Sequence, residues 1–189
     1  DGFSSPPHIH NVTYRAMVIK GLIHNDDPEA ENMWMPAGSF WTQPVGEPHI
    51  TSAKGEENIA YVEIDSGPYL VNPLEEAFDN GERPINIDKS NLVWLDASKT
   101  KIIEEGKSTK NIAVAFLWEN KEVTGNLIKL PANFTREIIS DGNQFHAVMI
   151  NGAADYIMPK SGEIKSLEPG SYFSSKGNSK HKIIANKGL

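Results

Sequence analysis

The sequence predicts an all-β protein made of two copies of one β unit, joined by a short helical segment. Three observations predict this fold class. Short β-type runs alternate with turn residues, one motif recurs at a constant offset, and three histidines stand at spacings that suit strands. Many short strands in this rhythm are typical of a β-barrel or a β-sandwich.

The predicted strands are runs rich in β-branched and aromatic residues. The clearest are residues 12–23, 59–64, 112–118, 125–130, 146–150 and 181–185. Turn signals separate them, among them Asp26-Asp27-Pro28, Asp79-Asn80-Gly81 and Asp141-Gly142-Asn143. This punctuation is what a chain of short strands requires.

One segment carries the signals of a helix. Asn72 can cap it, Pro73 suits the first helical position, and Glu75 and Glu76 suit the positive end of the helix dipole. We expect the helix to end near residues 79–81 and to belong to a linker between the two halves.

An internal repeat relates these halves. Gly38 and Gly170 are 132 positions apart, and so are His49 and His181. An offset of 131 relates three pairs upstream: Phe3 and Phe134, Tyr14 and Phe145, Gly21 and Gly152. One gap reconciles the copies, so we predict a first unit at 1–71, a linker at 72–91 and a second unit at 92–189.

The two copies differ in what precedes the motif. Residues 92–132 form a stretch of predicted strand before the second copy, whereas one residue precedes Gly2 in the first. We therefore expect the first unit to lack its opening strands, or to borrow them from the other half or from a partner chain. A homodimer is the expected assembly.

Composition excludes several classes of protein. Among 189 residues, 39% are hydrophobic and 23% are charged, as in a soluble globular protein of one large or two small domains. The net charge of −7 and scattered basic residues argue against binding to nucleic acid or to a membrane surface. The longest apolar run is too short to cross a bilayer.

The chain contains no cysteine, which excludes disulfides, thiolate metal sites and cysteine nucleophiles. It begins with Asp1, not Met, and has no visible signal peptide, so an upstream segment was removed or the sequence is a fragment. We expect a soluble protein of the cytoplasm or the periplasm.

Three histidines are the candidate metal ligands. His8 and His10 stand at i and i+2, so both imidazoles point to one face of a strand. His49 follows a turn rich in Pro and Gly and can return on a neighbouring strand to the same place. Three neutral imidazoles that converge inside a small barrel would hold one divalent transition metal ion.

The spacing of these residues resembles the two-part signature of the cupin superfamily. Gly2, His8, His10 and Gly21 fill the first part, and the second part is filled by Gly38, Pro44, Gly46 and His49. Tyr14 takes the position of the usual Glu, and Ala53 that of the usual Asn. With its second copy the chain resembles a bicupin, similar to a bacterial double-cupin family of unknown function. The resemblance implies two jelly-roll barrels with a metal inside.

Tyr14 in place of Glu leaves three neutral ligands, so the metal keeps its full charge and attracts anionic or chelating ligands. The phenol of Tyr14 can coordinate the metal, hydrogen-bond to a metal-bound water or fill volume. We favour a hydrogen-bond donor beside the metal over a fourth ligand, because an ordinary tyrosine has a pKa near 10. Nitrogen ligands suit Zn, Ni, Fe, Co or Cu.

A group of large apolar residues follows the first motif and is the candidate wall of a substrate pocket: Met33, Met35, Phe40 and Trp41. The alternative for each is ordinary core. Glu47 is a candidate general base, although a solvated loop carboxylate is the expected role. His24 and His146 are expected to be ordinary imidazoles satisfied by neighbours.

The second copy has lost the metal site. In its register Ile139, Asp141 and Phe145 replace His8, His10 and Tyr14, and His181 alone remains. We expect this half to hold no metal and to act structurally.

We predict a metal-dependent enzyme on a small organic substrate, of oxygenase type, with an isomerase or a hydrolytic lyase as variants. Alternatives are a non-catalytic small-molecule sensor and a scaffold with a structural metal.

Overall fold

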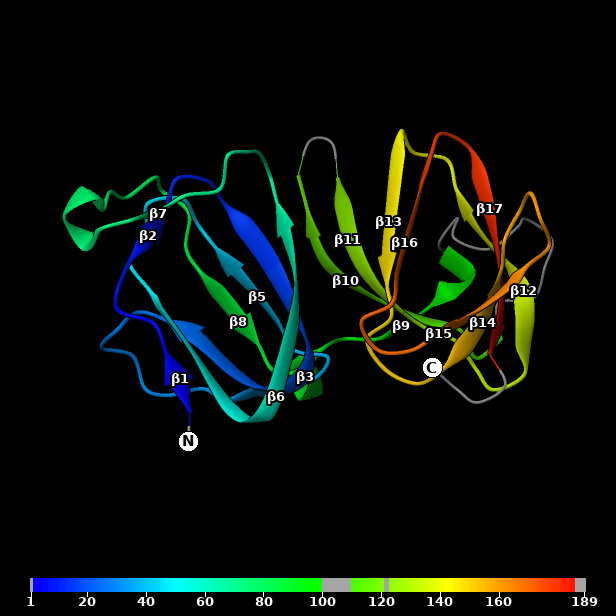
Figure 1. Cartoon of the computed structure of the whole chain (residues 1–189), viewed down its shortest axis with the longest axis horizontal. Helices are drawn as coiled ribbons and strands as arrows, with labels where there is room; N and C mark the ends of the chain where they lie inside the picture. The colour runs from blue at the N-terminus through cyan, green and yellow to red at the C-terminus, as the bar shows by residue number, and fades with distance from the viewer. Residues whose placement is uncertain (1, 100–109, 121–122, 186–189) are drawn as a thin grey trace. The chain divides into compact units, whose positions relative to one another are not determined.

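The computed structural model describes residues 2–99, 110–120 and 123–185 (Figure 1). Within these ranges the chain forms β-strands and short 3-10 turns, which confirms the predicted all-β class. It divides into two compact units, Asp1–Leu92 and Val93–Leu189. The described residues include no helix long and apolar enough to span a membrane.

The first unit is built on two long strands, β3 (Tyr14–Asp26) and β6 (Ile50–Ile64), which pair in antiparallel fashion. The sheet runs in the order β1-β6-β3-β5-β8, with β4 on β3. The short members are β1 (Phe3–Ser4), β4 (Met35–Pro36), β5 (Phe40–Gln43) and β8 (Ile85–Ile87). A separate pair joins β2 (Ile9–His10) to β7 (Val71–Asn72).

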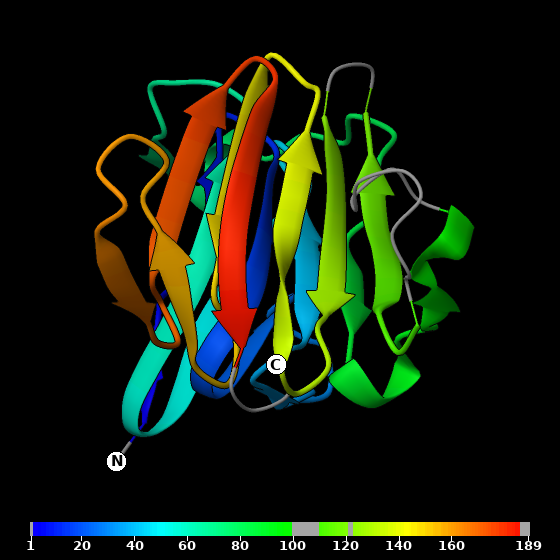
Figure 2. The same cartoon turned by 90° about the vertical axis from the view of Figure 1, so that its right-hand side faces the viewer.

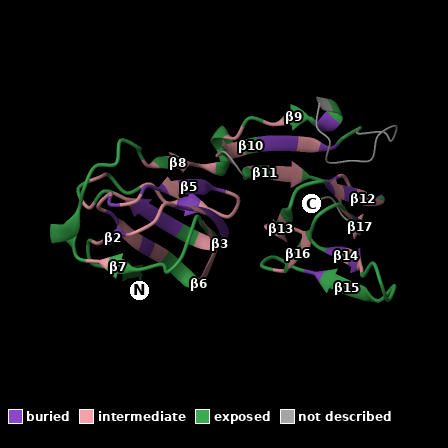
Figure 3. Cartoon of the chain, turned by 90° about the horizontal axis from the view of Figure 1, so that it is seen from above, coloured by how far each residue is buried: buried purple, intermediate pink, exposed green. Residues whose placement is uncertain are grey.

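The core of this unit lies on alternating positions of β3. Tyr14, Ala16 and Val18 point inward with Trp41 of β5 and Met35 of β4. Figure 3 shows how buried positions gather on β3 and β5. Alternate residues of a strand share one face, so these apolar side chains of β3 lie together on one side of the sheet.

Strand β6 is longer than its sequence predicts. Only residues 59–64 have an apolar strand pattern, because the stretch before them is polar, with Lys54 to Glu57 exposed. The strand nevertheless begins at Ile50, because Ile50–Lys54 pair with Leu22–Asp26, the second half of β3. The pairing is interrupted around Gly21, which has φ +82° and lies against the side chain of Asn58.

The predicted helix beginning at Asn72 is wrong. The segment holds one 3-10 turn, Leu74–Glu76, whose N-cap residue is Pro73 and lacks a side-chain cap. None of its residues is buried, so it has no apolar stripe to pack, and packing is the main source of helix stability. Further along, β8 pairs with β5, so part of the predicted linker belongs to the sheet of the first unit.

The described residues of the second unit form three sheets. Their orders are β11-β10-β9, β12-β17-β14-β15 and β13-β16. Strand β17, red in Figure 2, pairs with β12 on one side and β14 on the other. The strands are β9 (Leu95–Asp96), β10 (Ala113–Glu119), β11 (Thr124–Lys129), β12 (Phe134–Ser140), β13 (Gln144–Val148), β14 (Ala154–Ile157), β15 (Ile164–Leu167), β16 (Tyr172–Lys176) and β17 (Ser179–Ala185).

Two further 3-10 turns complete the described elements: Lys89–Asn91 and Ala97–Lys99. The second unit has its own apolar core, which includes Val114, Phe134, Ile138, Tyr156 and Ile183. Of the predicted strand stretch 92–132, residues 100–109 and 121–122 lie outside the described residues. That the first unit lacks its opening strands stays a prediction.

Candidate metal centre

Backbone pairing brings the three predicted histidines together. His8 and His49 form an antiparallel bridge, in which the His8 N–H donates to the His49 carbonyl at 3.1 Å and the reverse bond is 3.0 Å. Residues directly opposite each other in such a pair share a face. His10 lies two residues from His8 and therefore shares that face as well.

The imidazoles form a close cluster. Ring centroids lie 4.9 Å apart for His8 and His10, 4.3 Å for His8 and His49, and 5.0 Å for His10 and His49. One nitrogen from each ring lies within 4.8 Å of the others, and such a group could hold a metal ion. Nitrogens bound to one metal at about 2.1 Å lie within about 4.2 Å of each other, so small ring rotations would close the cluster.

Backbone carbonyls orient all three rings in the same way. The Nδ1 atom of His8 lies 2.8 Å from the Pro6 carbonyl, that of His10 lies 2.9 Å from the Leu70 carbonyl, and that of His49 lies 3.3 Å from the Glu47 carbonyl. A carbonyl only accepts, so each Nδ1 carries the proton and each Nε2 presents a lone pair. Metal-binding histidines are oriented by such bonds.

His49 is the most deeply placed ligand candidate. Its side chain is fully buried, and its Nε2 has no hydrogen-bond partner within the described part of the chain. Burial, with smaller effects from His8 and His10, lowers the pKa of His49 to about 3. Burial likewise lowers the pKa of His10, against the opposing effect of the Leu70 carbonyl. A neutral imidazole nitrogen with an available lone pair is a good ligand for a transition metal, so the residues fit a metal.

Tyr14 lies beside the cluster, but its hydroxyl is directed elsewhere. Its ring centroid is 5.4 Å from that of His10, while the hydroxyl donates to Asn25 Oδ1 at 3.0 Å. Asn25 also accepts from Thr51 and donates to Gln43, which makes a buried polar network. Burial raises the pKa of Tyr14 to about 12. The predicted contact of Tyr14 with the metal stays a prediction.

The structure places a second tyrosine against the cluster, one that the sequence did not indicate. The Tyr69 hydroxyl lies 2.8 Å from Nε2 of His10, and the two rings stack at 4.3 Å. Burial raises the pKa of the Tyr69 phenol, and nearby Tyr14 adds to the effect. Tyr69 is 59 residues from His10, in the loop before β7, so no local spacing links them.

The predicted pocket residues lie in or against the core. Met35, Phe40 and Trp41 are buried, and Met33 packs against that core from a half-buried position. Trp41 also donates to the Tyr14 hydroxyl at 3.5 Å. Their contact with a substrate stays a prediction.

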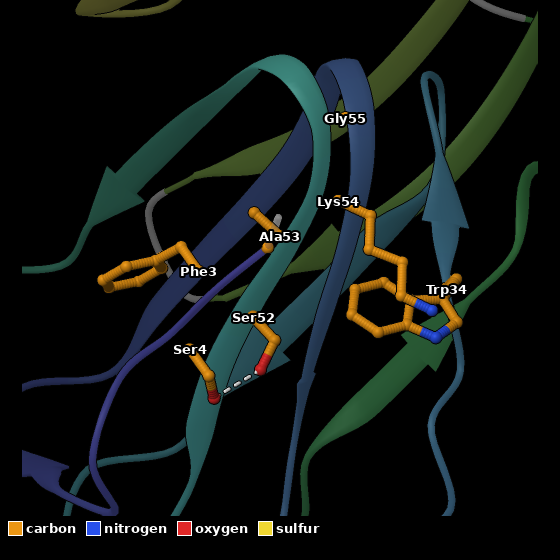
Figure 4. Close-up of a pocket in the computed structure, with 8 residues that line it drawn as sticks. Phe3, Ser4, Trp34, Ser52, Ala53, Lys54 and Gly55 are labelled. Atoms are coloured by element: carbon orange, nitrogen blue, oxygen red, sulfur yellow. Dashed lines mark hydrogen bonds between the residues drawn. The ribbon is translucent and has the colours of Figure 1, made fainter.

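A surface pocket of about 500 Å³ lies elsewhere in the first unit (Figure 4). It is lined by Gly2, Phe3, Ser4, Trp34, Ser52, Ala53, Lys54 and Gly55. The Lys54 ammonium lies 3.9 Å from the centre of the Trp34 ring, and the Ser52 hydroxyl donates to that of Ser4 at 2.7 Å. None of the three clustered histidines lines it.

The other singled-out residues have structural contacts. His24 is buried, and its Nδ1 accepts from the Met33 N–H at 3.2 Å. Its Nε2 has no partner among the described residues, so only one of its two ring nitrogens is hydrogen-bonded there. The carbonyl of Glu47 contacts His49 and accepts from Gln43. His146 lies on β13 with its ring 5.8 Å from that of Tyr172.

In the second unit both nitrogens of His181 are engaged. Its Nδ1 lies 2.9 Å from the Tyr156 hydroxyl, and its Nε2 lies 3.0 Å from that of Ser175. Phe145, the counterpart of Tyr14, stacks on the ring at 4.9 Å. Among the described residues, the cluster of His8, His10 and His49 is the one group of ligand side chains close enough to hold a metal.

No curated protein sequence matches the chain. Solved structures with a similar fold include dioxygenases. A provisionally assigned dioxygenase from Nostoc punctiforme has a TM-score of 0.72 at 17% identity, over 99% of this chain and 62% of its own. Salicylate 1,2-dioxygenase from Pseudoaminobacter salicylatoxidans has 0.56 at 14%, over 98% and 63%. Quercetin 2,3-dioxygenase from Acinetobacter baumannii has 0.53 at 12%, over 99% and 59%.

The chain thus spans less than two thirds of the length of each of these three proteins. At such identities the likeness concerns the fold. The family comparison covers the whole sequence: residues 1–189 match the family described as domain of unknown function DUF4437, and the chain belongs to that family.

Proposed function

We propose that this chain is a metal-dependent enzyme of oxygenase type that acts on a small organic substrate. His8, His10 and His49 hold one divalent transition metal ion. The observation that carries the proposal is that a backbone carbonyl engages Nδ1 of all three rings, which leaves every Nε2 as an acceptor, while one nitrogen of each ring lies within 4.8 Å of the others. Zn, Ni, Fe, Co and Cu all suit this donor set.

The proposal extends to the architecture. The two compact units correspond to two cupin barrels in tandem, the first with the metal and the second degenerate. The repeat of Gly38 to His49 at Gly170 to His181 supports this reading, since His49 and His181 occupy equivalent positions. A homodimer is the proposed assembly, because β1 and β8 end the path of the described sheet and offer edges for pairing.

When bound, the metal supplies a Lewis acid that attracts a chelating substrate and open positions for oxygen. The protein groups have separate tasks. His49 and His10 are buried and fix the direction of their nitrogens, whereas His8 is only half-buried and borders solvent. Burial keeps water from the inner side of the cluster, so a substrate approaches from the side of His8. The dioxygenases with this fold supply the reaction class to be tested first.

A non-catalytic sensor is the second candidate. It is favoured by exposed apolar side chains in the segment that follows Tyr69, namely Leu70, Val71, Leu74 and Phe78. Apolar groups beside a ligand site can contact a partner protein. A sensor would bind metal and ligand without consuming oxygen.

Metal analysis tests the shared core of both candidates. We expect about one metal ion per chain in the wild type. H49A removes a buried ligand and is expected to lose the metal. The matched control is H24A, which removes an equally buried imidazole outside the cluster and is expected to keep it.

Oxygen-consumption assays with catechols and small diketones then separate the enzyme from the sensor. The enzyme consumes oxygen with at least one substrate, and H49A does not. Unchanged metal content in H49A would contradict the metal site itself.

A further inference from the structure

We infer that Tyr69 supplies a fourth protein donor to the metal, so that the centre consists of three imidazoles and one phenolate oxygen. The inference rests on the metal site proposed above. Tyr69 is absent from the cupin-like motif of this chain and comes from a loop far along the sequence.

The Tyr69 hydroxyl lies at the nitrogen that would bind the metal. His10 Nδ1 donates to the Leu70 carbonyl at 2.9 Å, which leaves Nε2 as an acceptor. Across the 2.8 Å contact the phenol therefore donates to the lone pair of His10 Nε2. A metal bound to His10 replaces this proton, and the phenol oxygen is then its immediate neighbour.

The loop that carries Tyr69 is fixed to the strand that carries His10. The Asn11 side chain donates to the Pro68 carbonyl at 2.9 Å and accepts from the Leu70 N–H at 2.8 Å. Val71 pairs with His10 in the β2–β7 ladder. The loop cannot carry Tyr69 away without breaking the bond that orients His10, so the phenol oxygen remains within reach of the metal.

Distances are compatible with direct ligation. Two donors in neighbouring positions of an octahedral metal, each about 2.1 Å from it, lie about 3 Å apart. The observed 2.8 Å between the Tyr69 oxygen and His10 Nε2 needs little change to reach that value. The rings stack at an angle of 21°, which holds the phenol beside the imidazole.

The charge of the cluster and the contacts of the other nearby phenol also favour Tyr69 as the fourth donor. The cluster contains three neutral imidazoles and no carboxylate among the described residues. Tyr14, the other phenol nearby, is committed to Asn25 within a buried network. A phenolate at Tyr69 would offset one charge of the cation. The hydroxyl O–H bond breaks, an oxygen–metal bond forms, and the proton passes to solvent.

Metal titration of this chain, residues 1–189, tests the inference, with visible absorption and equilibrium dialysis as readouts. Cu(II) is the first probe, because it binds nitrogen ligands most tightly, and Fe(III) is the second. A phenolate bound to either ion gives a charge-transfer band in the visible, which imidazole ligands alone do not give. We expect the band in the wild type and one ion per chain.

Y69F is expected to lose the band while still binding one ion, with affinity weaker by about tenfold or more. Y14F is the matched control and is expected to keep the band. Tyr69 is 40% exposed, so loss of its hydroxyl leaves the fold intact, which circular dichroism checks.

Two results overturn the inference: one bound ion without a charge-transfer band in the wild type, or a band that survives in Y69F. Absence of any bound ion in the wild type overturns the metal site of the proposed function as well. Dialysis detects that failure independently of the spectrum.

Discussion

At the scale of single residues, the chemistry of the centre follows from which nitrogen of each imidazole carries the proton. The carbonyls of Pro6, Leu70 and Glu47 each engage Nδ1 of one ring, so all three rings carry the proton on Nδ1. Burial of His49 lowers the stability of the metal-free fold, because its Nε2 lacks any partner among the described residues. Such a group is stabilised when a metal binds it.

The buried His49 makes the stability of the metal-free protein depend on pH. Its pKa is about 3 in the folded chain and near 6.5 when unfolded, so the unfolded chain binds more protons between these values. Stability is therefore lost as the pH falls below 6.5. From pH 7 to pH 5 we expect this residue to lower the free energy of unfolding by about 2 kcal/mol.

Urea unfolding of the chelator-treated protein at the two pH values measures this loss. H49Q retains a polar side chain but cannot take up the proton, so it is expected to show a loss smaller by about 2 kcal/mol. An equal loss in the wild type and in H49Q would contradict the assigned burial of the imidazole.

At the scale of elements, the turn from Pro44 to His49 fixes the third ligand. The Gly46 N–H donates to the His10 carbonyl at 2.9 Å, and its carbonyl accepts from the Phe78 N–H at 3.1 Å. Gly46 has φ +76°, and a Cβ there would lie 2.7 Å from the Phe78 carbonyl oxygen. Glycine is required for both reasons.

G46A is therefore expected to lower the free energy of unfolding by about 3 kcal/mol and to weaken metal binding. The control is G55A, whose φ is also positive but where a Cβ meets nothing within 4 Å. We expect a cost of about 1–2 kcal/mol there and unchanged metal binding. Equal costs in the two variants, measured by denaturant unfolding, would refute the role of the Phe78 contact.

The strands and turns also explain which features could be predicted from the sequence and which could not. The spacing of His8 and His10, with a turn before His49, gave the cluster because strand periodicity decides which side chains share a face. The helix from Asn72 failed because capping residues do not stabilise a segment without a buried stripe. The first part of β6, Ile50–Lys54, was missed because its pairing with β3, and not its own pattern, makes it extended.

Tyr69 could not be found from local patterns. Its place beside His10 depends on pairing between β2 and β7, two strands of two residues each that are about 60 residues apart. Neither has a recognisable run of strand residues. Long-range pairings of this kind become visible only in the folded chain.

At the scale of the whole molecule, the two histidines that the sequence repeat aligns have different surroundings. Tyr156 and Ser175 engage both nitrogens of His181. His49 keeps Nε2 without a partner among the described residues. The difference predicts one metal per chain, bound in the first unit.

X-ray absorption spectroscopy of the metal-loaded chain tests the central claim most directly, because outer-shell scattering counts the imidazoles around the metal. Three imidazoles are predicted in the wild type and two in H8A. Fewer than three in the wild type, or the same number in both proteins, would contradict a centre formed by His8, His10 and His49.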